Sequence, residues 1–207
     1  PGEGGGDNGN LWSVVSVNLV IQLMIEANMR DELTAFISPI VDSLKCSARS
    51  APYNPGTLIK IRTLVSLVSA YGSKWGDITT ASDIYSLKTA ILLLAGTAGE
   101  PEDNEKDLRW SETILDNQYL HVLATHPSPS STINRQVEAL HATMTRDGRT
   151  DVFTFTTMMT YCAKRGDEGL PAMLGLWEEM RASGILDDGA QLQQHQVEKQ
   201  SVETSSS

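Results

Sequence analysis

The hydrophobic pattern is clearest between residues 151 and 188, where it predicts two consecutive amphipathic helices. Asp151 is a good N-cap for the first helix, and Lys164-Arg165-Gly166 predicts its end, because cations and a left-handed glycine favour helix C-termini. Pro171 suits the first turn of the second helix, and Gly184 predicts where it ends. The apolar stripes comprise Phe153, Phe155, Met158, Met159 and Cys162 in the first helix, and Met173, Leu174, Leu176, Trp177 and Met180 in the second. This segment is therefore expected to form a helical hairpin.

Weaker versions of the same pattern occur upstream. Turns are predicted at Asn28, at Gly76-Asp77 and at Pro127, each between two helix-like segments. The chain is therefore predicted to be all-α, an α-solenoid of about four helical hairpins in which each repeat packs on its neighbours. The expected hairpins span residues 12–46, 57–95, 108–148 and 151–187.

The remaining segments are predicted to connect or flank these hairpins. Residues 11–188 form the expected helical-repeat domain, and residues 96–107 an acidic linker within it, rich in Asp and Glu. A glycine-rich segment over residues 1–10 and a polar tail over residues 189–207 are expected to be flexible termini.

The hairpin at residues 151–188 resembles a pentatricopeptide repeat. The matching residues are Phe153 to Met159 in the first helix, the turn Lys164-Arg165-Gly166, then Leu176-Trp177-Glu178-Glu179-Met180, Gly184-Ile185 and Asp188. The inter-helix turn is slightly long, and the family's proline before Asp188 is missing. The resemblance implies a solenoid that reads single-stranded RNA at about one base per repeat, and it implies a mitochondrial or plastid location. An irregular α-helical bundle and a tetratricopeptide protein are the alternative folds.

Charge weakens the implied RNA function. The chain has a formal net charge of −10, whereas phosphate contacts normally need clustered Lys and Arg. Its cations are scattered, and the RNA-contact candidates among them are Lys60, Arg62, Lys164 and Arg165.

The resemblance also implies base-reading positions near the start of each first helix and at each repeat end. The candidates are Ser66, Asn117 and Thr157, with Asp188 as the partner of Thr157 at the repeat end. The competing interpretation is that Thr157 is only a solvent-facing helix residue and that Asp151 and Asp188 are helix caps.

Motifs for catalysis or metal binding are not evident. His121 and His126 are five residues apart, so they do not share a helix face as an i, i+4 metal pair would. No nucleophile elbow and no phosphate-binding glycine loop occurs. The two cysteines, Cys46 and Cys162, lie far apart and are expected to be reduced thiols. We therefore expect no enzyme activity, cofactor, metal or small-molecule substrate, and no membrane span, because no apolar run reaches roughly 18 residues.

Together these patterns predict a non-enzymatic repeat subunit of an organelle ribonucleoprotein. The resemblance places it in the mitochondrial matrix, in an assembly such as the mitochondrial ribosome. Its expected partners are protein subunits of that assembly, with single-stranded or ribosomal RNA as a second partner. A stand-alone RNA-binding adaptor in organelle RNA processing or translation is one alternative. A helical protein-interaction or viral assembly protein is the other.

Overall fold

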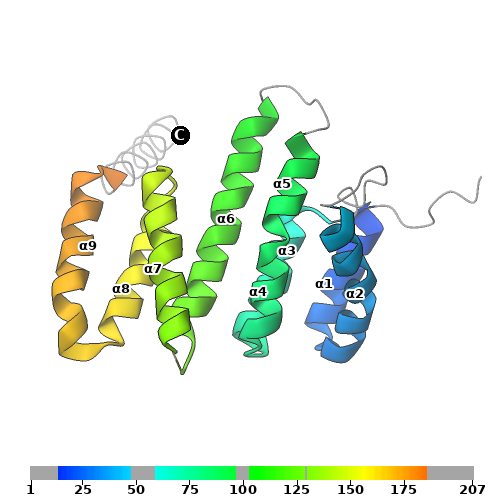
Figure 1. Ribbon diagram of the computed structural model, residues 1–207, viewed down its shortest axis with the longest axis horizontal. Coiled ribbons are helices and arrows are strands. Elements are labelled where there is room, and N and C mark those ends of the chain that lie inside the picture. The colour runs from blue at the N-terminus through cyan, green and yellow to red at the C-terminus, as the bar shows by residue number, and fades with distance from the viewer. Residues whose placement is uncertain (1–13, 48–58, 97–102, 129, 186–207) are drawn as a thin grey trace, which may run out of the picture. The chain divides into compact units, whose positions relative to one another are not determined.

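The computed structural model describes residues 14–47, 59–96, 103–128 and 130–185, and every regular element in these ranges is helical (Figure 1). The predicted all-α class is therefore confirmed. The chain divides into two compact units, unit 1 up to Val122 and unit 2 from Leu123 onward. The predicted flexible termini, residues 1–10 and 189–207, lie outside the described residues.

Unit 1 is built from consecutive helices that pack on their neighbours. Helix α1 contacts α2 and α3, α3 contacts α4, and α5 contacts α2, α3 and α4. The elements are α1 (Val14–Glu26), α2 (Arg30–Ser47), α3 (Ile61–Ser69) with a π-helical turn (Ala70–Lys74), α4 (Ile78–Ser86), α5 (Lys88–Gly96) and most of α6 (Asp103–Thr125). Their buried side chains include Val17, Ile21, Leu33, Ile37, Leu44, Leu64, Leu67, Val68, Tyr71, Ile84, Leu87 and Leu115.

Polar side chains join the turn of the first hairpin to the turn of the second. Asn28 is left-handed, with a φ of 58°, and its Oδ1 accepts a hydrogen bond of 2.7 Å from Trp75 Nε1. Arg30 donates to Asp77 at 2.6 Å, while Asp77 also accepts the Thr80 amide at 3.0 Å and so caps α4. Burial opposes the charged form, but the hydrogen bonds from Thr80 and Arg30 hold the pKa of Asp77 below its ordinary value. The turns predicted at Asn28 and before α4 are thus both present.

A glycine lets the π-helical turn approach α6 closely. A Cβ built on Gly72 would lie 2.2 Å from Val122 Cγ1, far inside van der Waals contact. Residues with a side chain are therefore excluded from this position unless α6 shifts.

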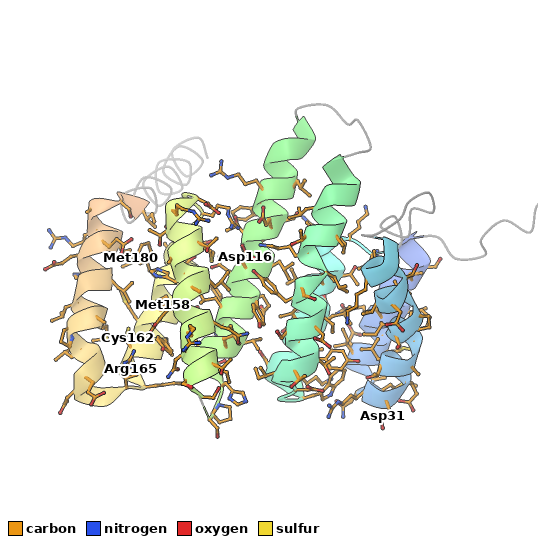
Figure 2. The ribbon with its side chains drawn as sticks, viewed as in Figure 1. Asp31, Asp116, Met158, Cys162, Arg165 and Met180 are labelled. Atoms are coloured by element: carbon orange, nitrogen blue, oxygen red, sulfur yellow. The ribbon has the colours of Figure 1, made fainter. Side chains whose placement is uncertain are left out.

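Unit 2 contains the end of α6 and the helices that follow it. These are α7 (Ser131–Arg146), α8 (Val152–Ala163), a 3₁₀ turn (Gly166–Gly169) and α9 (Leu170–Ala182). Helix α8 packs on α9, and the ring of Phe155 on α8 meets His141 on α7 edge-on at 6.3 Å. Met158 and Met180 are buried, and Figure 2 shows them in the layer of side chains between α8 and α9. The Cys162 thiol is also buried, and burial raises its pKa.

The hairpin formed by α8 and α9 follows the sequence pattern closely. Gly166 and Gly184 have φ values of 64° and 73°, so each occupies the left-handed conformation that ends a helix. Pro171 lies in the first turn of α9, as expected from its missing N–H. Gly169 lies where the 3₁₀ turn meets α9, and its Cβ would be 1.9 Å from the Cys162 carbonyl oxygen. The connection between α8 and α9 therefore leaves no room for a side chain at Gly169.

Asp151 begins α8 with a reciprocal capping box, which confirms it as the N-cap. Its Oδ1 accepts the Thr154 amide at 2.8 Å, and the Thr154 hydroxyl accepts the Asp151 amide at 3.1 Å. The backbone amides of Asp151 and Thr154 at the start of α8 therefore both have hydrogen-bond acceptors.

Replacing Asp151 by alanine is expected to lower the free energy of unfolding by about 1 kcal/mol, because the Thr154 amide loses its acceptor. Urea denaturation followed by circular dichroism measures the change. Asp151→Asn is the matched control, since its amide oxygen still caps the helix. Equal losses in the two variants would contradict a capping role.

The acidic linker expected over residues 96–107 lies partly outside the described residues, which omit 97–102. Helix α5 continues through Gly96, and α6 already begins at Asp103. Residues 103–107 of the charge run that indicated a loop therefore belong to the start of a helix.

Candidate functional site

The RNA-contact candidates on α3 share one end of that helix. Lys60 is the N-cap residue and Arg62 lies in the first turn, and both are exposed. Ser66 is partly exposed one turn later, where its hydroxyl donates to the Arg62 carbonyl at 3.4 Å. Arg62 and Ser66 are spaced i, i+4, so they lie on the same face of α3. This end of α3 therefore presents two cations and a hydroxyl.

Two of the predicted base-reading residues do not face solvent. Asn117 on α6 is 5% exposed and Thr157 on α8 is 4% exposed. The threonines of α8 that reach the surface are Thr156 and Thr160, and Phe153 is exposed near them. Side chains of adjacent residues in a helix point about 100° apart around the helix axis. Thr156 therefore faces solvent, whereas Thr157, one position later, faces the packed side of α8.

The reason for this difference is that α8 packs on two sides. Phe155 contacts α7 through His141, while α8 also packs on α9. A helix between two neighbours buries a wider arc than the single apolar stripe that the sequence suggested. Thr154 and Thr157 fall inside that arc.

The cations after α8 have partners within unit 2. Lys164 Nζ donates to the Ala124 carbonyl at 3.2 Å, which satisfies an acceptor in the last turn of α6. Arg165 lies 3.6 Å from Glu138 on α7 and 5.9 Å from the Tyr161 ring centroid. Both side chains thus tie helices of unit 2 together. Asp188, the proposed partner of Thr157, lies outside the described residues.

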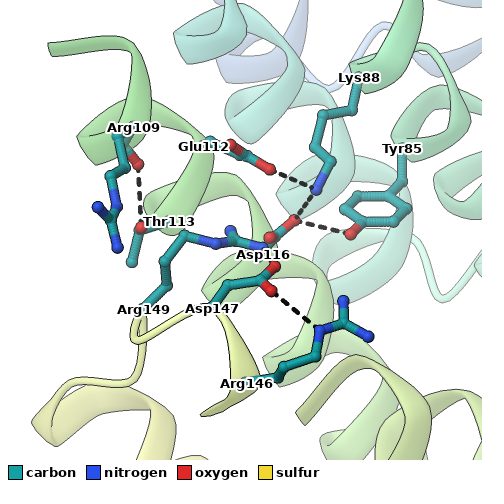
Figure 3. Close-up of polar contacts among 9 residues, drawn as sticks. All are labelled: Tyr85, Lys88, Arg109, Glu112, Thr113, Asp116, Arg146, Asp147 and Arg149. Carbon is teal, nitrogen blue, oxygen red and sulfur yellow. Dashed lines mark hydrogen bonds and ion pairs between the residues drawn. The ribbon is translucent and has the colours of Figure 1, made fainter. Parts of the chain in front are cut away.

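A polar cluster that the sequence analysis missed joins α4, α5 and α6 in unit 1 (Figure 3). The Asp116 side chain is fully buried, and its Oδ1 accepts hydrogen bonds from Tyr85 at 2.7 Å and from Lys88 at 2.8 Å. Lys88 also donates to Glu112 at 3.1 Å. The Tyr85 ring stacks on Tyr119 at 4.0 Å. The cluster therefore holds a partly buried cation between two carboxylates, of which Asp116 is fully buried.

The sequence did contain a signal for this cluster. Glu112 and Asp116 are spaced i, i+4 on α6, and Asp116 directly follows the buried Leu115. A charged residue within an apolar arc needs a partner of opposite charge, and Lys88 supplies it from α5. The partner is 28 residues away, so sequence spacing alone did not identify it.

Apolar side chains are exposed at regular spacing on α1 and α9. On α1, Leu19 and Leu23 are 58% and 54% exposed. On α9, Leu170, Leu174 and Trp177 are 44–54% exposed. We refer to these sets as the α1 outer face and the α9 outer face. Side chains of this size rarely gather on one exposed helix face without a partner.

Within the described ranges, no group of three or more His, Cys, Asp or Glu side chains is placed to hold a metal ion. In the same ranges no helix is long and apolar enough to cross a bilayer. Comparison with protein-family models, curated proteins and solved structures gives no match for this chain.

Proposed function

We propose that this chain is a non-enzymatic helical-repeat subunit that binds other proteins within a larger assembly. In this proposal its hairpins stack as a solenoid similar to pentatricopeptide repeats. The order of the helices supports it, because α1 with α2, α3 with α4, and α8 with α9 pack as consecutive hairpins. The location in the mitochondrial matrix, in a ribonucleoprotein such as the mitochondrial ribosome, rests on the repeat resemblance at residues 151–188.

The observation that carries the proposal is the exposure of large apolar side chains on the α1 and α9 outer faces. Burying one leucine contributes about 1.5–3 kcal/mol, so a partner that covers such a face gains substantial free energy. Both outer faces therefore present exposed apolar surface of the kind that marks protein interfaces.

RNA binding is the second candidate, and one feature of α8 favours it. Phe153 and Thr156 are exposed together on this helix, and an aromatic ring beside a hydroxyl suits stacking and hydrogen bonding to a base. Against it stand the net charge of −10 and the internal contacts of Lys164 and Arg165. Protein binding is therefore the better-supported function.

The test is co-purification of the tagged full chain from the cells that make it, with and without nuclease. We expect the same protein partners in both arms, because the apolar faces bind protein directly. Loss of all partners after nuclease would contradict the proposal. If the isolated chain then retained labelled single-stranded RNA, and a variant with Phe153→Ala and Thr156→Ala did not, the RNA-adaptor function would replace it.

A further inference from the structure

The α9 outer face is separate from the side of α9 that builds the core of unit 2. Leu176 and Met180 are buried. Leu170, Leu174 and Trp177 are spaced four and three residues apart, so they form one solvent-facing stripe, about 100° around the helix from the buried pair. Within the described part of unit 2, this stripe is therefore left exposed.

The surroundings of the stripe are acidic. Asp167 and Glu168 in the 3₁₀ turn precede it, and Glu178 lies beside Trp177 and one turn beyond Leu174. All three carboxylates are exposed. Arg181, the single cation in the sequence of α9, stands one turn beyond Trp177 at the C-terminal end of the stripe. The three carboxylates outnumber it, so these surroundings attract cations rather than phosphate.

We infer that the α9 outer face docks an amphipathic helix of a partner protein, with an apolar stripe flanked by Lys or Arg. The inference rests on the proposed function and adds the partner's chemistry to it. A leucine-type stripe on the partner would pack ridge-into-groove against Leu170, Leu174 and Trp177. Its flanking cations would meet Glu168 and Glu178. Trp177 is the expected anchor, because tryptophan dominates the binding energy of many interfaces.

The experiment measures binding of labelled synthetic helical peptides to the full chain by fluorescence anisotropy. The probe has leucines at helical spacing and lysines at the remaining surface positions, and a matched peptide carries glutamate in place of every lysine. We expect the lysine peptide to bind, and the glutamate peptide to bind at least tenfold more weakly. Losing one hot-spot residue lowers the affinity of an interface by about this factor.

Paired variants locate the site. Leu174→Ser with Trp177→Ala should weaken binding of the lysine peptide about tenfold or more. Trp110→Ala changes an equally exposed apolar side chain on α6, outside both outer faces, and should leave binding unchanged. Glu168→Gln with Glu178→Gln should weaken binding at low salt and flatten its salt dependence. The replaced apolar side chains are all exposed, so thermal unfolding should show the variants to be folded.

Two outcomes would overturn the inference. Equal binding of both peptides, or equal affinity in the α9 variant and the Trp110→Ala variant, would show that the face does not select a cationic helix. Self-association that sedimentation velocity detects and that Leu174→Ser with Trp177→Ala abolishes would assign the face to a second copy of this chain. Neither result changes what is expected from the co-purification with and without nuclease. That experiment tests the proposed function separately.

Discussion

Replacing Asp116 by alanine is expected to lower the free energy of unfolding by about 3–5 kcal/mol, the usual loss when one partner of a buried ion pair is removed. The Asp116 side chain is fully buried and accepts hydrogen bonds from both Tyr85 and Lys88. Alanine would leave the Lys88 ammonium with Glu112 alone, and would leave the Tyr85 hydroxyl without this acceptor. Chemical denaturation with matched circular dichroism and tryptophan signals measures the loss.

A surface pair provides the control for Asp116. Lys45 and Asp83 lie 4.0 Å apart with their side chains 47% and 66% exposed. Asp83→Asn should change the free energy of unfolding by less than about 0.5 kcal/mol, because exposed ion pairs contribute little. Combining Asp116→Leu with Lys88→Met should recover part of the loss, since the cluster then holds no cation that has lost its buried carboxylate partner. A loss below about 1 kcal/mol for Asp116→Ala would contradict a buried, charge-coupled cluster.

Gly169→Ala is expected to be the most damaging single-methyl addition in unit 2, with a loss of about 3 kcal/mol, the upper part of the range for overpacked sites. The added Cβ would stand 1.9 Å from the Cys162 carbonyl oxygen, which belongs to the backbone of the last turn of α8. A backbone oxygen cannot rotate away as a side chain does. The 3₁₀ turn must therefore move, and it carries the start of α9 with it.

Gly175→Ala is the matched substitution within α9, the helix that follows Gly169. Nothing lies within 4 Å of the Cβ that it would add. Alanine favours a helix interior over glycine, so this variant should be more stable by about 0.5–1 kcal/mol. Urea midpoints of the two variants against the parent give both values. Similar midpoints for Gly169→Ala and Gly175→Ala would contradict this prediction. They would show that the α8–α9 connection has room for a methyl group at position 169.

Helix positions and turns were predictable because local chemistry determines them. Asn28, Gly166 and Gly184 adopt the left-handed conformation that Asn and Gly tolerate best, and Asp151 accepts a hydrogen bond within its own first turn. None of these features depends on a distant partner. A sequence read in short windows therefore contains the information that specifies them.

The buried faces were harder to predict because packing decides them. The apolar spacing of α8 correctly indicated Phe155 and Met158 as core, but Phe153 of the same predicted stripe is exposed, and a second neighbouring helix also covers Thr157. Likewise, Asp116 became part of the core only through Lys88 and Tyr85 on other helices. The exposure of Leu174 and Trp177 was equally hard to predict, since an apolar residue on a helix is normally assigned to the core.

The burial of Cys162 makes this residue an internal reporter on unit 2. Only a thiolate attacks an alkylating reagent, and this thiol is both enclosed and less acidic than usual. Modification must therefore wait until α8 separates from its neighbours. In a chain whose Cys46 has been replaced, the rate of labelling relative to that of a free thiol would give the opening free energy of the hairpin directly.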